Sequence, residues 1–119
     1  MPTQPSVAAP TPTVSAANVI SVFSDAYTNI AANLNPGWGQ ATVVSQVQIA
    51  GNTTLKYAGL NYQGIEFGTN QNLSTMTHLH IDYYSANSSQ LKAYLISPGP
   101  VETAKTLSVP TISGWNSIE

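Results

Sequence analysis

The chain has 119 residues, of which 7% are charged, and its few cations are three lysines with no arginine. Three scattered lysines do not form the basic cluster that phosphate contacts require, so the composition argues against nucleic acid and against a membrane held by a basic patch. The chain has no cysteine, which excludes disulfides, thiol catalysis and thiolate metal sites, and it has no apolar run long enough to span a bilayer.

Residues 1–17 are dominated by Pro, Thr, Ser and Ala and show no apolar periodicity. This composition is typical of a semi-extended linker. We expect the segment either to join the rest of the chain to an upstream domain or to be an untethered tail, and its Pro–Thr spacing favours the linker.

Residues 18–119 contain short β-type runs separated by turn signals and no helical pattern of useful length. Asn18–Tyr27 is rich in β-branched and aromatic residues and is predicted as the first strand. Thr28–Gln40 is predicted as a loop that presents Trp38 between two glycines. The further predicted strands are Thr42–Ala50, Thr54–Gly59, Asn61–Gly68, Met76–Ala86, Gln90–Ser97, Lys105–Val109 and Trp115–Glu119.

Their number and spacing predict an all-β fold, an antiparallel β-sandwich. Gly51-Asn52 is expected to turn a hairpin, and Gln90–Ser97 is expected to lie beside Met76–Ala86. The sequence stops inside the last predicted strand, which would leave an unpaired edge. We therefore expect this sequence to be a fragment, whose sandwich is incomplete.

The run from Thr77 to Tyr84 is the most informative stretch, because its alternation gives two different faces. Leu79, Ile81 and Tyr83 fall on the face expected to enter the core, whereas His78, His80, Asp82 and Tyr84 fall on the opposite face. Two histidines and a carboxylate can bind zinc, and the same side chains can hydrogen-bond sugar hydroxyls. A solvated outer face is the third interpretation, and it is the one favoured.

Several motifs follow one another in an order that resembles a known family. They are Val22–Tyr27, Asn35–Gln40, Leu55–Tyr57 with Asn61–Gly64, Met76–Asp82 and Leu95–Glu102. Together they resemble the β-sandwich carbohydrate-binding-type modules appended to secreted Bacteroidetes glycoside hydrolases, notably laminarinase-like β-glucanases. The resemblance covers residues 18–119 and implies a jelly-roll or galactose-binding-like sandwich. In that family the chain continues past the motif matched by Gly114-Trp115, so the closing strands are expected to be missing.

The residues themselves suggest where a ligand binds. An aromatic ring can stack on the apolar face of a pyranose, and Tyr84, on the same face as His78, His80 and Asp82, is the best candidate for this. Trp38 is expected to be more exposed because glycines flank it in a loop, but a structural role is favoured for each aromatic residue taken alone. Related sandwiches often hold a structural calcium near the first strand, and Asp25 is the residue that would supply an oxygen to it. A turn-capping role for Asp25 is favoured over this metal role.

Catalysis has little support, because nothing places Glu66 and Asp82 at the separation that glycoside hydrolysis requires. The expected function is that of a non-catalytic accessory module which holds a secreted polysaccharide-degrading enzyme near a β-glucan-like polysaccharide. Such a module is extracellular or at the cell surface, and its enzyme domain is covalently linked upstream. The alternative is a structural or adhesive spacer with no ligand of its own.

Overall fold

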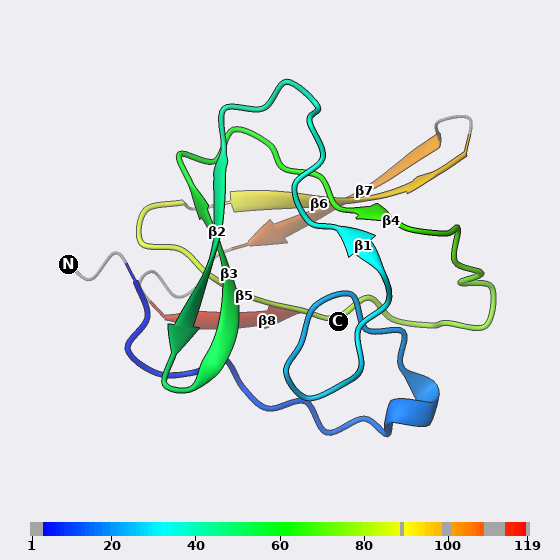
Figure 1. The fold of residues 1–119 in the computed structure, drawn as a ribbon, viewed down its shortest axis with the longest axis horizontal. Helices are drawn as coiled ribbons and strands as arrows, with labels where there is room; N and C mark the ends of the chain where they lie inside the picture. The colour runs from blue at the N-terminus through cyan, green and yellow to red at the C-terminus, as the bar shows by residue number, and fades with distance from the viewer. Residues whose placement is uncertain (1–3, 89, 99–100, 109–113, 119) are drawn as a thin grey trace. The chain divides into compact units, whose positions relative to one another are not determined.

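A computed structural model of the chain describes residues 4–88, 90–98, 101–108 and 114–118, and these form an all-β structure (Figure 1). The single helical element in these ranges is a 3-10 turn, η1 (Ala16–Asn18), and none of their residues form a helix suited to crossing a membrane. The strands are β1 (Ala32–Asn33), β2 (Val43–Ile49), β3 (Asn52–Ala58), β4 (Glu66–Phe67), β5 (Ile81–Tyr84), β6 (Gln90–Ser97), β7 (Val101–Ser108) and β8 (Trp115–Ile118).

These strands pair two by two, and every pair is antiparallel: β1 with β4, β2 with β3, β5 with β8, and β6 with β7. The prediction of an antiparallel all-β chain is confirmed. Two-stranded sheets do not by themselves make up the two layers of a sandwich. The chain divides into two compact units, which are described separately: Thr11–Met76, and Met1–Pro10 with Thr77–Glu119. They are called the Thr11–Met76 unit and the Thr77–Glu119 unit.

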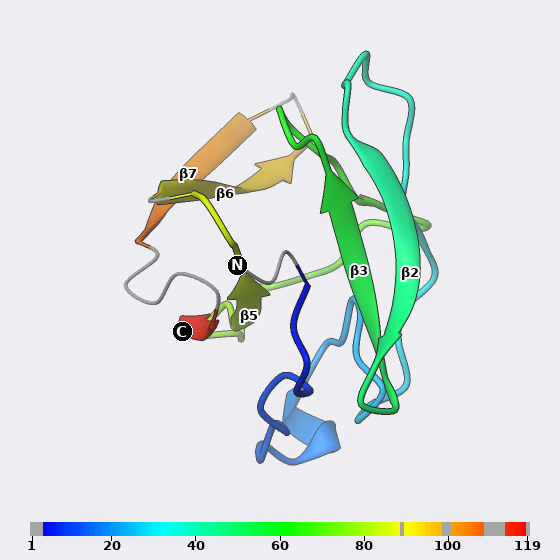
Figure 2. The same ribbon diagram turned by 90° about the vertical axis from the view of Figure 1, so that its left-hand side faces the viewer.

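The β2–β3 hairpin is the longest element of the Thr11–Met76 unit, and its strands run side by side in both views (Figures 1 and 2). Ile49 pairs with Asn52, so the two-residue turn is Ala50-Gly51 and begins one residue earlier than the predicted Gly51-Asn52 turn. Both turn residues have positive φ, 50° for Ala50 and 82° for Gly51, as a type I′ hairpin turn requires. Ile49, which is 3% exposed, packs at the end of β2 next to this turn.

The predicted strand Asn18–Tyr27 is wrong. Its backbone forms one isolated bridge, between Ser21 and Asn29, and no strand. The side chain of Asn29 accepts hydrogen bonds from Ser21 Oγ at 2.6 Å and from Ser24 N at 3.0 Å. These local side-chain bonds compete with a sheet ladder and close the segment into a loop.

The predicted strand Asn61–Gly68 is also shorter than expected, because only Glu66 and Phe67 pair, with Asn33 and Ala32 of β1. The first part of the predicted strand makes loop contacts instead. Asn61 N donates to Thr42 Oγ1 at 3.3 Å, and Thr42 Oγ1 donates to Tyr62 O at 2.8 Å.

In the Thr77–Glu119 unit the β6–β7 hairpin pairs eight residues of each strand, from Gln90 with Ser108 to Ser97 with Val101. β6 has the predicted bounds, and β7 starts earlier than the predicted Lys105, whereas Val109 lies outside the described residues. The expected pairing of Gln90–Ser97 with Met76–Ala86 is wrong, since β6 finds its partner in the strand that follows it directly. Leu107 of β7 is 4% exposed and is the most buried apolar residue described in this unit.

The predicted strand Met76–Ala86 is reduced to β5, Ile81–Tyr84, which pairs with β8 from Ile81 with Ile118 to Tyr84 with Trp115. The residues before Ile81 have no strand partner, so the alternation of two faces holds only from Ile81 onward. The predicted strand Trp115–Glu119 is confirmed as β8 over Trp115–Ile118, and Glu119 lies outside the described residues.

Candidate functional site

Trp38 packs closely against Gly64, in the Thr11–Met76 unit. A Cβ atom built on Gly64 would be 2.7 Å from Trp38 Cη2 and still closer to Cζ3 and Cε3 of the same ring. The indole therefore occupies the space that any larger residue at position 64 would need. Trp38 is nevertheless 44% exposed. Gly64 thus lets the ring rest on the backbone while the rest of the ring faces solvent.

Tyr62 is held beside Trp38 and is also exposed, at 47%. Its hydroxyl donates a 2.6 Å hydrogen bond to the carbonyl oxygen of Trp38. Its backbone is fixed by the buried Thr42, whose hydroxyl donates to Tyr62 O, and by Asn61 Oδ1, which accepts from Tyr62 N at 2.8 Å. These contacts fix the two aromatic residues relative to each other, although they are 24 positions apart in the sequence.

Three side-chain amides form a network next to these rings. Gln40 Oε1 accepts from Trp38 N at 2.8 Å, while Gln40 Nε2 donates to Asn35 Oδ1 at 3.1 Å and to Pro36 O at 2.7 Å. Gln63 Nε2 donates to the same Asn35 Oδ1 at 3.2 Å and to Gly64 O at 3.1 Å. The side-chain oxygen of Asn35, Oδ1, thus accepts hydrogen bonds from two amides, whereas its Nδ2 donates to no described residue.

We call this group the aromatic–amide cluster: Asn35, Trp38, Gln40, Tyr62, Gln63 and Gly64. It combines exposed aromatic rings with preorganised uncharged donors and acceptors. Hydrogen bonding between side chains fixes their rotamers before any ligand arrives, which reduces the entropy that binding would cost. The arrangement is chemically suited to a neutral molecule with an apolar face and several hydroxyl groups.

The polar residues predicted on the Thr77–Tyr84 run engage one another and their neighbours. His80 Nε2 lies 3.1 Å from Asp82 Oδ1, and Ser117 Oγ of β8 donates to the same carboxylate oxygen. His78 Nδ1 and Thr77 Oγ1 are hydrogen-bonded at 2.7 Å. Across the described ranges there is no group of three His, Cys, Asp or Glu side chains arranged to hold a metal. His78, His80 and Asp82 are thus not arranged as such a group, and zinc binding at this run stays a prediction.

Tyr84 packs against Trp115 of the paired strand in an edge-to-face arrangement, with ring centroids 5.8 Å apart and planes at 64°. Aromatic pairs favour this geometry because the positive ring edge meets the negative face. Trp115 Nε1 donates to Val7 O at 2.8 Å. The prediction that Tyr84 stacks on a sugar remains a prediction, and its ring has this aromatic neighbour.

Asp25, the predicted calcium ligand, accepts a 2.7 Å hydrogen bond from Thr53 N with its Oδ2. Thr53 lies at the start of β3, so Asp25 ties the N-terminal loop to the β2–β3 hairpin. Calcium takes six to eight oxygen ligands. Among the described residues Asp25 belongs to no group of three or more His, Cys, Asp or Glu side chains that could hold a metal. The donor set gives no argument for calcium, and the metal role stays a prediction.

The predicted site residues belong to two units: Trp38 lies in the Thr11–Met76 unit, and His78, His80, Asp82 and Tyr84 lie in the Thr77–Glu119 unit. Glu66 and Asp82, considered as a carboxylate pair, are divided in the same way. The three amides beside Trp38 were missed as site residues. Their signal lay in Asn35–Gln40 and Asn61–Gly64, two turn-rich motifs that each combine an aromatic residue with amides.

Comparisons of this chain with protein-family models, with curated proteins and with solved structures give no match. Its function therefore has to be argued from the residues themselves.

Proposed function

We propose that this chain is a non-catalytic carbohydrate-binding module and that the aromatic–amide cluster is its glycan-binding surface. The observation that carries the proposal is the placement of Trp38, whose ring rests on Gly64 while 44% of the residue stays exposed. Trp38 lies together with the exposed Tyr62 and with hydrogen-bonded amides, which distinguishes it from an aromatic residue exposed on its own, such as Tyr94. A pyranose offers a flat C–H face that matches such a ring.

The uncharged surroundings of Trp38 support a neutral ligand. Sugar hydroxyls both donate and accept hydrogen bonds, and side-chain amides offer both kinds of group. The Oδ1 atom of Asn35 already accepts hydrogen bonds from Gln40 and Gln63, so its Nδ2 is the group of this side chain that can donate to a sugar hydroxyl. No charged side chain takes part in the hydrogen bonds of the cluster. A phosphate or carboxylate ligand would find no cation in this network.

The wider setting of the module is part of the proposal. We infer a jelly-roll-type sandwich module, extracellular or at the cell surface, that is linked to an upstream polysaccharide-degrading enzyme and binds a β-glucan-like polymer. A single stacked ring contributes about 1 kcal/mol, so binding to one sugar unit is weak. Attachment to a polymer with many repeats raises the effective concentration of the linked enzyme without requiring a tight site.

Affinity gel electrophoresis against laminarin and other β-glucans tests the proposal. We expect the unaltered chain to be retarded in a gel that contains the bound glycan. Trp38→Ala is expected to weaken binding by about fivefold, equivalent to about 1 kcal/mol, because it removes the stacking platform.

Tyr62→Ala and Tyr94→Ala form a matched pair for the same assay. Both tyrosines are about half exposed, at 47% and 49%, but Tyr94 lies on β6, outside the cluster. We expect Tyr62→Ala to reduce the retardation and Tyr94→Ala to leave it unchanged. Unchanged mobility of the unaltered chain with every glycan would exclude the proposal.

A structural or adhesive spacer is the second candidate, and one observation favours it. On β5 and β8, Asp82 is engaged by His80 and Ser117, and Tyr84 is packed on Trp115. Asp82 and Tyr84 thus have partners within the chain, as a purely structural role would require. If the chain is a spacer, His80→Ala and Tyr84→Ala change stability alone, and the Trp38 variant migrates like the unaltered chain in every gel.

A further inference from the structure

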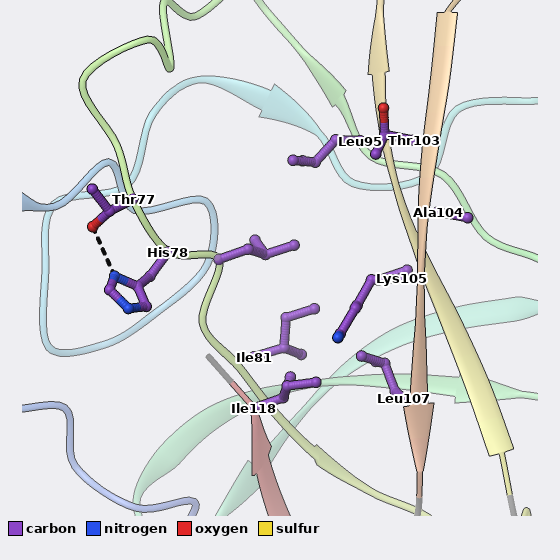
Figure 3. A pocket seen from close by; sticks show the side chains of 11 residues that line it. Thr77, His78, Ile81, Leu95, Thr103, Ala104, Lys105, Leu107 and Ile118 are labelled. Atoms are coloured by element: carbon purple, nitrogen blue, oxygen red, sulfur yellow. Dashed lines mark hydrogen bonds between the residues drawn. The ribbon is translucent and has the colours of Figure 1, made fainter.

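The Thr77–Glu119 unit contains an open hollow of about 230 Å³ that the proposed glycan site does not use. Its walls come from the run before β5, from β5 itself and from β6, β7 and β8 (Figure 3). Most of the lining is aliphatic: Leu79, Ile81, Ala93, Leu95, Leu107 and Ile118. Leu107 is buried, whereas Leu79 and Leu95 remain 40% and 43% exposed. Apolar surface is therefore left open to solvent at this place.

One cation interrupts the apolar lining. Lys105 extends from β7 into the hollow, and its ammonium group points toward Ile81 (Figure 3). Among the residues that the structure describes, no Asp or Glu lines the hollow and no carboxylate forms an ion pair with Lys105. The charge of this lining is thus positive, and it faces an aliphatic wall.

We propose that this hollow binds a small amphipathic anion, a molecule with an aliphatic body and one carboxylate. The aliphatic body covers Leu79, Leu95 and Leu107, while the carboxylate meets the Lys105 ammonium group. Ligand pockets of this type are mostly apolar with a few placed polar groups that fix the orientation of the ligand. Pockets for drug-sized ligands span about 300–1,000 Å³, so a hollow of about 230 Å³ suits a smaller molecule such as a medium-chain fatty acid.

Sodium octanoate is the probe, titrated into the isotopically labelled chain and followed by amide and methyl NMR shifts. We expect saturable shifts centred on Leu79, Leu95 and Leu107. Each added methylene raises affinity by up to about fourfold, so octanoate binds up to about fifteen times more tightly than hexanoate. Octyltrimethylammonium, which has the same tail length and the opposite charge, is expected to bind more weakly than octanoate.

Two pairs of variants distinguish binding at this site from nonspecific hydrophobic binding elsewhere on the chain. Lys105→Gln is expected to weaken octanoate binding about two- to fivefold at low salt, the range for an exposed ion pair. Lys92→Gln is the control because Lys92 alternates with Ala93 on β6 and does not line the hollow. Leu95→Ser should weaken binding, whereas Ile96→Ser, at a neighbouring position with 48% exposure, should not.

Both lysine changes are at exposed positions, and far-UV circular dichroism verifies that each variant keeps its β structure. Equal dissociation constants in Lys105→Gln and Lys92→Gln would overturn the role of the cation. Equal constants in Leu95→Ser and Ile96→Ser, or octanoate shifts spread over both units, would overturn the site. Failure of laminarin binding leaves this proposal standing, because the residues that carry the two proposals do not overlap.

Discussion

A methyl group added to Gly64 collides with the indole of Trp38, which makes Gly64→Ala the sharpest structural perturbation of the proposed glycan site. The new Cβ would lie 2.7 Å from Trp38 Cη2, with two further ring atoms closer still. Carbon atoms pack at about 3.5–4.0 Å, so the ring has to move by about 1 Å or more. Gly64 does not have positive φ, so alanine brings no backbone strain and the effect is purely steric.

The cost can be worked out in two ways. If the ring shifts by this amount and its surroundings yield, overpacking of this kind costs about 1–3 kcal/mol. If the ring swings into solvent, it exposes on the order of 100 Å² of apolar surface, or about 2.5 kcal/mol. Both routes predict a free energy of unfolding lowered by about 1–3 kcal/mol, and displacement of the ring weakens glycan binding by up to the roughly fivefold expected for Trp38→Ala.

Gly37→Ala is the matched control, because a Cβ at Gly37 meets no atom within 4 Å and its φ is not positive. Alanine there restricts the unfolded chain and is expected to stabilise the protein by about 0.4–1 kcal/mol. Urea denaturation of both variants, with tryptophan fluorescence as the signal, measures the difference. Equal midpoints for Gly64→Ala and Gly37→Ala would refute the packing of Trp38 on Gly64.

Three further predictions concern the β2–β3 hairpin and the support of Tyr62. Ala50→Asn should stabilise the protein by about 0.5–1 kcal/mol in urea denaturation, because asparagine tolerates the positive φ that Ala50 adopts before Gly51; an unchanged midpoint would contradict the turn type. Burial raises the pKa of Tyr57 above its usual value, so the folded state keeps the phenol proton longer than the unfolded state. Its contribution to stability is full below about pH 10 and is lost as pH rises through the folded pKa. Tyr57→Phe should therefore flatten the fall in stability above about pH 10, and parallel curves would disprove this. Thr42→Val should lower the free energy of unfolding by about 1–3 kcal/mol, since it leaves the carbonyl oxygen of Tyr62 without its donor. Thr42→Ser, which keeps the hydroxyl, should retain most of the stability. An equal loss of stability in both variants would show that the hydroxyl is not the cause.

Sequence reasoning succeeded where a strand finds its partner close by in the chain. β2 and β3 are joined by a two-residue turn, and β6 has the bounds expected from its alternating residues. In such hairpins the pattern of residues and the turn signal act on the same short stretch. Register then follows from the turn, which is why a shift of one residue at Ala50-Gly51 was the main error for this hairpin.

Prediction from sequence failed where strand pairing depends on residues far away in the chain or on side-chain hydrogen bonds. Asn18–Tyr27 has strand-forming residues, but Asn29 binds Ser21 and Ser24 with its side chain and the segment stays a loop. β5 begins at Ile81, where its pairing with β8 begins at Ile118. The residues that determine both outcomes lie outside the window in which alternation is read.

The candidate site was predicted only in part, again because some of its contacts join residues that are far apart in the sequence. Exposure of Trp38 was expected from its flanking glycines, and the residue is indeed 44% exposed. The contact between Trp38 and Gly64, and the bond from Tyr62 to the Trp38 carbonyl oxygen, join two loops. Nothing in the local sequence around Trp38 indicates which glycine it will rest on or which amides will surround it.

The indole N–H signals of the two tryptophans provide the most direct test of the central claim. In the unaltered, isotopically labelled chain, Trp38 and Trp115 each give one such signal, and Trp38→Phe assigns them. Trp115 Nε1 donates to Val7 O, so this signal is an internal reference outside the cluster. Titration with laminarin oligosaccharides is predicted to shift the Trp38 signal in a saturable way and to leave that of Trp115 in place. A Trp38 signal that stays fixed, or that shifts no more than the Trp115 signal, with every β-glucan oligosaccharide tested would contradict the account.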